Sequence, residues 1–499
     1  MKNPYFCGCN FLNSRMKRFF LAFLPLFLYL AAYPQESSTQ IRAVWLTTNW
    51  QLDWPSSGLS ADGQKRQLQG ILDSLQKLNF NTVLFQVRIR GSVLYRSKME
   101  PMSSFVRAGT SDGRPFDPLA FTIEECHKRN MECHAWMVTY PLGSQGVFSP
   151  KKQNFLSRNQ ELCKLYKGEW YLDPGNPKTN DYLLSLVKEI VEGYDVDGIH
   201  FDYIRYPDEN TSFPDKNTFK KYGNWESLDS WRRSNVTRFV TQAYQYVKGV
   251  KPWVQVSSSP IGIYRSLSGK GDRWSGFESV FQDSYNWLKL GVQDAVYPMM
   301  YYEDKNFYPY VDDWLKNANG RFVVPGLGVY KMLSREQNWD LQVVTRQIDF
   351  LKSTAASGEA YFRLGMILGN LKGIKDELLS YYRNPAKLPP MNWLNNEPPA
   401  SPDDFQIYRT DNRTVQMKWN APSGKDLTYT VYSFYPNDSI DLDNPENIVA
   451  SGVRKTELTL TIENSTQGKY YAVSASNRFH IEGKMSQIAY FLPSLDLQK

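Results

Sequence analysis

Cysteine and histidine are scarce in this sequence, and their scarcity excludes two kinds of scaffold. Only five cysteines and four histidines occur in 499 residues. Cys7 and Cys9 lie before an N-terminal apolar run, and Cys126, Cys133 and Cys163 remain as an odd, widely spaced set. Such a set forms no disulfide framework and does not match the ligand spacing of a zinc site. We therefore expect buried free thiols, no metal and no cofactor.

A strong net charge is also absent once the N-terminus is set aside. The net charge of the chain is +7, but residues 1–35 contain four basic and no acidic residues, and without them it falls to +3. No dense basic run appears in the rest of the chain. Because nucleic-acid-binding proteins cluster basic residues on one face, we expect no nucleic-acid partner.

The chain has one long apolar run, and this run is short for a membrane span. Lys17-Arg18 precede apolar residues 19–32, and polar residues follow. This order is typical of an export signal, and a spanning helix needs about 20 apolar residues. Residues 1–35 are therefore predicted to be a signal peptide that starts at Met1 or Met16, with an uncleaved anchor as the alternative. We expect an exported protein, in the periplasm, at the cell surface or outside the cell, without stable membrane insertion.

Strand-like and helix-like segments alternate over residues 36–390, which predicts a (β/α)8 TIM barrel. No glycine-rich fingerprint follows the first strand, and this argues against a doubly wound open sheet. The predicted strands are residues 41–48, 82–88, 132–138, 198–205, 253–259, 295–300, 321–329 and 360–367. The predicted helices include residues 65–78, 118–130, 181–193, 231–250, 281–290, 341–357 and 372–382.

Polar residues alternate with apolar ones in several of these strands. The outward face of a barrel strand packs on helices and must be apolar, so the intervening residues face inward. A carboxylate in such an enclosed strand costs several kcal/mol unless it is paired or faces water. Asp202, near the C-terminal end of its strand, is therefore a candidate catalytic residue, with a structural pair to Arg205 as the alternative. The inward-facing pairs are Gln86 and Arg88, His134 and Trp136, and His200 and Asp202.

The composition and the length of the alternating segments change after the predicted barrel. Prolines recur in residues 391–402, which predicts a linker. Residues 403–499 contain short alternating segments, at 415–419, 428–434, 458–462 and 470–476. This pattern predicts a small antiparallel sandwich of the immunoglobulin-like or fibronectin type III class.

Five motifs of the barrel segment resemble a known family in the same order along the chain. They are Arg42-Ala43-Val44-Trp45, Phe85-Gln86-Val87-Arg88, His134-Ala135-Trp136, Asp197-Gly198-Ile199-His200-Phe201-Asp202 and Tyr297-Pro298-Met299-Met300-Tyr301-Tyr302. They resemble glycosyl-hydrolase-like family 10, and the resemblance implies a secreted bacterial (β/α)8 protein that acts on polysaccharides. Some members carry a second acid directly after the position of Asp202, where this chain has Tyr203. The C-terminal part resembles a fibronectin type III module through Pro398-Pro399, Trp419 and residues 472–477.

Glycoside hydrolysis needs two carboxyl groups that flank the scissile bond. Asp202 is predicted to be the nucleophile or base. Glu303, which follows the sixth strand, is predicted to be the general acid, because packing against the rings of Tyr301 and Tyr302 raises a carboxyl pKa. Asp304 is the competing choice, and a solvated loop carboxylate is the alternative for Glu303.

Further residues are candidates for contact with substrate. For Arg88 the alternative is an internal salt bridge, and for Trp136 it is packing inside the barrel. The candidates are Gln86, Arg88, His134, Trp136, His200, Arg205, Tyr206, Tyr301 and Asp304.

The sequence thus predicts an exported, metal-independent glycoside hydrolase whose partner is a polysaccharide or oligosaccharide substrate. The alternative is a non-catalytic glycan-binding protein on the same barrel.

Overall fold

The computed structural model describes residues 36–492 apart from 108, 112, 114, 147–155, 157, 208–211, 225, 271–273, 412–413 and 462–466. The predicted signal peptide lies outside the described residues and stays a prediction. No helix among the described residues combines the length and apolar character that crossing a membrane requires.

The central feature of the fold is a closed ring of parallel strands. Neighbouring strands pair in sequence order, and the last strand, β13, pairs with β1. Two short pieces, β11 and β12, lie on one stretch of chain. The first pairs with β10 and the second with β13, so the ring closes into the predicted (β/α)8 barrel. The strands are β1 (Ile41–Leu46), β2 (Thr82–Ile89), β4 (Glu132–Val138), β8 (Gly198–Asp202), β9 (Gln255–Ser258), β10 (Ala295–Val296), β11 (Phe322–Val323), β12 (Gly326–Leu327) and β13 (Gly358–Tyr361).

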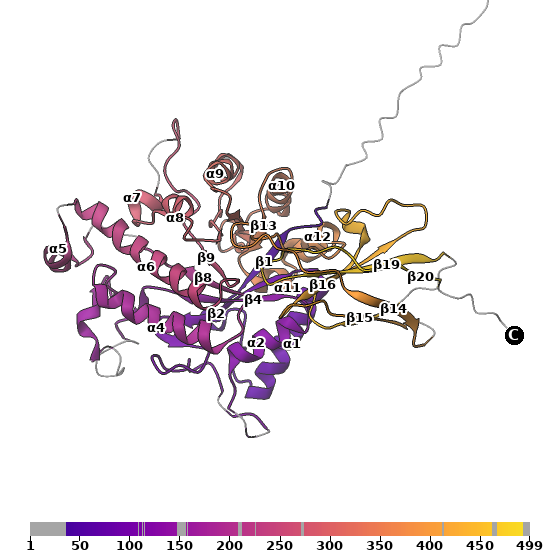
Figure 1. The fold of residues 1–499 in the computed structure, drawn as a ribbon. Coiled ribbons are helices and arrows are strands. Elements are labelled where there is room, and N and C mark those ends of the chain that lie inside the picture. Colours follow the sequence, from indigo (N-terminus) through magenta and orange to yellow (C-terminus); the bar gives the residue numbers. More distant parts are fainter. Residues whose placement is uncertain are drawn as a thin grey trace, which may run out of the picture. The chain divides into compact units, whose positions relative to one another are not determined.

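Helices surround the strand ring (Figure 1). Several begin at a side chain that accepts a hydrogen bond from a free backbone N–H, as Ser60, Asp117 and Ser227 do. The main helices are α1 (Ala61–Lys77), α2 (Pro118–His127), α4 (Pro177–Gly193), α6 (Leu228–Val250), α8 (Ser284–Lys289), α9 (Asp304–Lys316), α10 (Leu341–Lys352) and α12 (Ile374–Tyr381). Shorter ones are α5 (Lys216–Tyr222), α7 (Gly276–Ser279) and α11 (Leu364–Leu368).

The barrel has two apolar cores, one on each face of its strands. Val83, Phe85 and Met137 belong to the core between strands and helices. Trp45 and Trp136 belong to a separate core inside the ring. The predicted alternation of inward and outward side chains is confirmed for β4 and for β2 as far as Gln86.

Several strands are shorter than predicted, and the structure also contains a small sheet that was not predicted. The last predicted strand ends at Tyr361, and the apolar run after it forms α11, because a short apolar run does not distinguish a strand from a buried helix. The long segment after β4 contains a three-stranded antiparallel sheet in the order β5-β7-β6. Its strands are β5 (Pro141–Ser144), β6 (Cys163–Tyr166) and β7 (Glu169–Leu172).

The C-terminal segment forms a small all-β unit of two antiparallel sheets. Trp419, Val431 and Val473 pack in its core. An all-β unit after the barrel is confirmed, and its assignment to fibronectin type III stays a prediction. One sheet contains β14 (Asp403–Arg409), β15 (Thr414–Asn420) and β18 (Glu457–Thr461), and the other contains β17 (Ile448–Val453), β16 (Thr428–Phe434), β19 (Lys469–Ser476) and β20 (Ala489–Phe491).

The proline-rich segment before β14 packs against the barrel. Met391 is buried with the core inside the ring. The Trp393 indole N–H donates to the Asp294 carboxylate at 3.0 Å, and its ring packs edge-on against Phe322. The segment predicted to be a linker is therefore held by the N-terminal end of the barrel.

Candidate active site

A cavity of about 500 Å³ opens at the C-terminal ends of the barrel strands, where active sites of this fold lie. It is lined by residues that follow several strands, among them Trp45, Asn49, Leu52, Gln86, Arg90, Trp136, Glu169, Asp202, Tyr203, Arg205, Ser259, Trp274, Tyr301 and Phe362.

Asp202 stands at the end of β8 and is 7% exposed. Its Oδ1 accepts hydrogen bonds from the Tyr203 N–H at 2.7 Å and the Ser259 hydroxyl at 2.9 Å. Its Oδ2 accepts one from the Trp136 indole at 3.2 Å. Burial raises the pKa of Asp202, and these hydrogen bonds and the nearby Arg205 charge offset only part of that rise. Asp202 is thus fixed in position and able to hold a proton at higher pH than an ordinary aspartate.

His200 lies beneath this carboxylate, inside the ring. The Trp45 indole donates to His200 Nε2 at 3.2 Å, so Nδ1 carries the proton and meets the Ser257 hydroxyl at 2.9 Å. Complete burial, with the nearby His134 as a smaller cause, holds the pKa of His200 well below its usual value. The neutral ring does not line the cavity. Instead it accepts the hydrogen bond that orients Trp45, and Trp45 does line the cavity.

Four of the predicted substrate contacts line the cavity, namely Gln86, Trp136, Arg205 and Tyr301. Gln86 Oε1 accepts the backbone N–H groups of Thr48 and Asn49, so this residue also holds the loop after β1. The Tyr301 ring stacks on Phe362 with centroids 5.8 Å apart.

Arg88 was expected inside the barrel but is turned away from it. The register of β2 against β4 shifts between Gln86 and Arg88, so Arg88 pairs with the outward-facing Met137. A bulge of this kind reverses the face of the residues that follow it. Arg88 is buried in an ion pair with Glu100 at 2.6 Å, which confirms the alternative of an internal salt bridge.

Two other predicted contacts also lie outside the cavity. His134 faces inward near the N-terminal end of the ring, where its Nε2 meets Glu132 at 2.9 Å. Tyr206 is fully buried against the rings of Phe213 and Phe281.

Glu303 and Asp304 do not reach the cavity. Glu303 is exposed at the N-terminus of α9. Asp304 forms a surface ion pair with Arg346 at 2.8 Å and accepts a hydrogen bond from Tyr308. Contrary to the prediction, neither Glu303 nor Asp304 therefore lines the cavity with Asp202, because both lie at the start of α9.

Glu169 is the carboxylate that lines the same cavity as Asp202. These two are the carboxylates that line it among the described residues. Glu169 starts β7, is 35% exposed, and pairs with Arg90 at 3.1 Å. The sequence contains a signal for the hairpin that carries Glu169, because a two-residue turn with glycine is typical of hairpins. Here Lys167-Gly168 form that turn between β6 and β7, and both residues adopt a positive φ.

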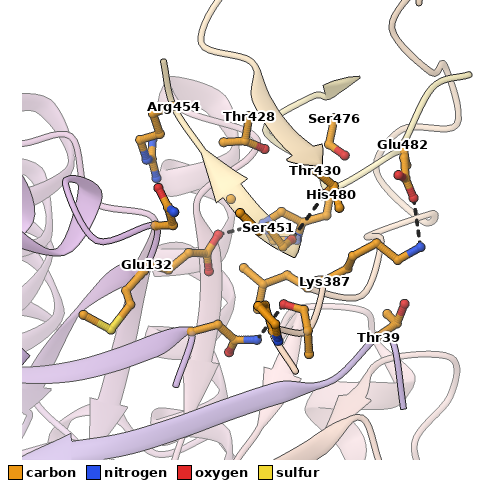
Figure 2. Close-up of a pocket in the computed structure, with 18 of the residues that line it drawn as sticks. Thr39, Glu132, Lys387, Thr428, Thr430, Ser451, Arg454, Ser476, His480 and Glu482 are labelled. Atoms are coloured by element: carbon orange, nitrogen blue, oxygen red, sulfur yellow. Dashed lines mark hydrogen bonds and ion pairs between the residues drawn. The ribbon is translucent and has the colours of Figure 1, made fainter. Parts of the chain in front are cut away.

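A second cavity, of about 660 Å³, lies at the opposite end of the barrel against the C-terminal unit. Figure 2 shows hydroxyl groups of that unit facing Glu132 and Lys387. Two of its carboxylates, both half-buried, are held in ion pairs: Glu132 with His480, and Glu482 with Lys387. Asp197 likewise pairs with Arg454 at 2.8 Å. Since these charges join barrel and C-terminal unit, we place the chemistry at the mouth instead.

The remaining predictions on composition concern thiols and metals. Cys126, Cys133 and Cys163 are buried free thiols, as expected. Within the described part of the chain, no group of three or more His, Cys, Asp or Glu side chains has the arrangement to hold a metal ion.

The chain matches a known protein family and is similar to several known proteins. Residues 40–325 match the model of the family described as Glycosyl hydrolase-like 10. The chain is 29% identical to Glycosyl hydrolase YngK of Bacillus subtilis (strain 168), over 91% of this chain and 93% of that protein. It is 31% identical to Glycosyl hydrolase DigH of Escherichia coli (strain K12), over 54% of this chain and 67% of that protein. The glycoside hydrolase domain of PgaB (BpsB) from Bordetella bronchiseptica aligns at 14% identity and a TM-score of 0.48, over 69% of this chain and 98% of that one.

Proposed function

Because the chain belongs to the glycosyl hydrolase-like 10 family, we propose that it is an exported glycosidase that hydrolyses O-glycosidic bonds of a polysaccharide. The observation that carries this proposal is the pairing of a buried carboxyl, Asp202, with an ion-paired one, Glu169, in a single cavity at the barrel mouth. Export rests on the N-terminal signal pattern alone.

The different surroundings of the two carboxyl groups divide their roles. Burial raises the pKa of Asp202, which suits the group that donates a proton to the leaving oxygen. Glu169 instead forms an ion pair with Arg90 at 3.1 Å, and we assign it the role of nucleophile or base. This division reverses the role that the sequence predicted for Asp202, because the balance between burial and hydrogen bonding at its carboxyl group is set by the tertiary structure.

The reaction follows from these roles. Asp202 protonates the glycosidic oxygen while Glu169, or a water that it activates, attacks the anomeric carbon. The bond from that carbon to the leaving oxygen breaks, and water supplies the new hydroxyl group and returns a proton to the site. Trp45, Trp136 and the stacked Tyr301 supply apolar walls against which a sugar ring packs.

A non-catalytic glycan-binding protein is the second candidate. It is favoured by Tyr203, which stands where some family members carry a second acid.

The test measures turnover and binding of a panel of polysaccharides by wild type, Asp202→Asn, Glu169→Gln and Glu303→Gln. Both cavity variants should lose about 10²–10⁴-fold in turnover, because positioned acid–base groups contribute this much. Glycan affinity should survive in both, since the ring contacts are unchanged. Glu303→Gln is the matched control and should keep wild-type turnover, because Glu303 lies outside the cavity.

Activated aryl glycosides separate the two roles. Asp202→Asn should lose less on these substrates, which need little protonation, whereas Glu169→Gln should lose equally on both kinds. Tight binding without cleavage by wild type would establish the glycan-binding alternative. Full turnover by Glu169→Gln would remove Glu169 from the mechanism.

A further inference from the structure

Trp50 is the most exposed large apolar side chain in the part of the chain that the structure describes, at 68%. It belongs to a short turn, η1 (Asn49–Gln51), that follows β1 at the barrel mouth. Its neighbours Asn49 and Leu52 line the active-site cavity. Trp50 is not itself part of the cavity wall, so it lies beside the edge of the cavity with most of its ring surface open to water.

The loop that carries Trp50 is held firmly on both sides. On one side, Gln86 accepts the N–H groups of Thr48 and Asn49 at 3.0 and 2.8 Å. On the other, Asp53 accepts the Thr47 N–H at 2.9 Å and pairs with Arg363. The exposure of Trp50 is thus a property of an ordered loop.

The backbone at Trp50 is also strained. Its φ of 56° and ψ of 18° lie in the left-handed region, which an aromatic residue rarely adopts. Such conformations persist where the surrounding structure over-determines them, and they cluster at ligand-binding sites. Tyr203, next to Asp202, combines the same features, with a φ of 49° and 41% exposure.

A second exposed tryptophan stands across the mouth. Trp274 is 43% exposed, lines the cavity and lies on the loop after β9. In the order of the ring, β9 is four strands away from β1, so the two loops lie on opposite sides of an eight-stranded barrel. Asp202 is the last residue of β8, and this strand lies between β1 and β9 along the ring.

We propose that Trp50 and Trp274 are stacking platforms for sugar rings on opposite rims of the mouth. The substrate is then a glycan chain that crosses the whole mouth, and cleavage occurs within the chain and not at its end. Exposed aromatic faces suit this role, because they present a large, rigid apolar surface to the apolar face of a sugar. The inference rests on the proposed function and adds the length of the substrate and the mode of attack.

The experiment uses a length series of soluble oligosaccharides from the polysaccharide that wild type turns over best. It compares wild type, Trp50→Ala, Trp50→Phe, Trp274→Ala and, as a control, Tyr490→Ala. Tyr490 is a similarly exposed ring, at 52%, on the C-terminal unit. The measurements are kcat/KM for each length, product sizes by mass spectrometry, and binding to the catalytically impaired Asp202→Asn background by calorimetry.

We expect Trp50→Ala and Trp274→Ala to lower kcat/KM and affinity about tenfold for long chains and to leave the shortest substrates unchanged. Trp50→Phe should recover most of this loss, Tyr490→Ala should match wild type, and early products should be internal fragments. Equal losses at every length, no loss at any length, or release of single terminal sugars from the start would overturn the inference while leaving the glycosidase intact. If wild type binds glycans without cleaving them, the proposed function fails. In that case, selective loss of long-chain binding by Trp50→Ala would support the stacking platforms, and unchanged binding would overturn them.

Discussion

Replacing His480 by glutamine should weaken the junction between barrel and C-terminal unit, and more so at pH 6 than at pH 8.5. His480 follows β19, and its Nε2 lies 2.7 Å from Glu132 Oε1 at the start of β4 (Figure 2). Its Nδ1 lies 3.2 Å from the Pro389 carbonyl oxygen. Both partners are acceptors, so both ring nitrogens donate and the imidazole is protonated.

The pH dependence follows from the pKa shifts of the pair. Burial opposes the charge on His480, but the attraction of Glu132 outweighs it and raises the pKa of His480 above 6.5. A raised pKa in the folded state means that this stabilisation is fully present below pH 6.5 and is lost as the pH rises through the folded value. Although burial opposes its charge as well, His480 and His134 lower the pKa of Glu132 to about 2. Its contribution is therefore present above about pH 4.5 and lost as the pH falls toward 2.

The size of the effect follows from what remains after the substitution. Removing one partner of a buried ion pair costs about 3–5 kcal/mol. Glu132 still has His134 Nε2 at 2.9 Å, so we expect a smaller loss, about 2 kcal/mol near pH 6. Because the pKa of His480 is raised in the folded state, the difference between wild type and variant should shrink as the pH rises from 6.5 to 8.5.

The assay is urea unfolding of wild type, His480→Gln, Glu132→Gln and the double variant at pH 5.5, 6.5, 7.5 and 8.5. The double-mutant cycle isolates the interaction between the two side chains, and an NMR titration of the His480 ring measures its pKa directly. If wild type and His480→Gln lose stability in parallel across this range, the ring is not charged in the folded protein and the argument fails.

Four other outcomes are expected. A chain ending near residue 393 should melt at lower temperature than the whole protein by differential scanning calorimetry, because Asp197 loses both Arg454 and Arg478. An unchanged melting temperature would show that the barrel is independent. Ser259→Ala removes a hydrogen bond that lowers the pKa of Asp202, so the basic limb of the kcat/KM profile should move to higher pH. Movement of the acidic limb would instead make Asp202 the base. Chelation by EDTA should leave turnover unchanged, because two carboxyl groups carry the steps; loss restored by a divalent cation would contradict this. N-terminal sequencing of protein from the native host should begin near residue 36, and an intact Met1 or Met16 would contradict export.

The local patterns of this chain were sufficient to predict most of its elements. The predicted third strand, residues 132–138, has the bounds of β4, and the C-terminal segment 428–434 has those of β16. In both segments the strand is indicated by residues that are close together in the sequence, so no distant contact is needed to predict it. Asp202 was likewise found from its place at the end of an apolar strand.

Positions that depend on distant contacts were predicted less well. Arg88 follows the inward pattern of its strand, but one extra residue in the register with β4 turns it outward to Glu100. Alternation assumes a regular strand, and whether a bulge forms depends on the partner strand. Glu303 follows the sixth strand closely in sequence, yet α9 begins there and keeps it exposed.

The sequence by itself determined the alternation of strands and helices, the family motifs and one catalytic candidate, because each is encoded in near-neighbour chemistry. Only the tertiary structure decided that Glu169 faces the same cavity as Asp202. These residues lie on different elements, β7 and β8, and closure of the ring with its inserted hairpin brings them together. It also decided the proton-holding character of Asp202. That property comes from burial, which the hydrogen bonds from Trp136 and Ser259 offset only in part, and burial is a property of the whole fold.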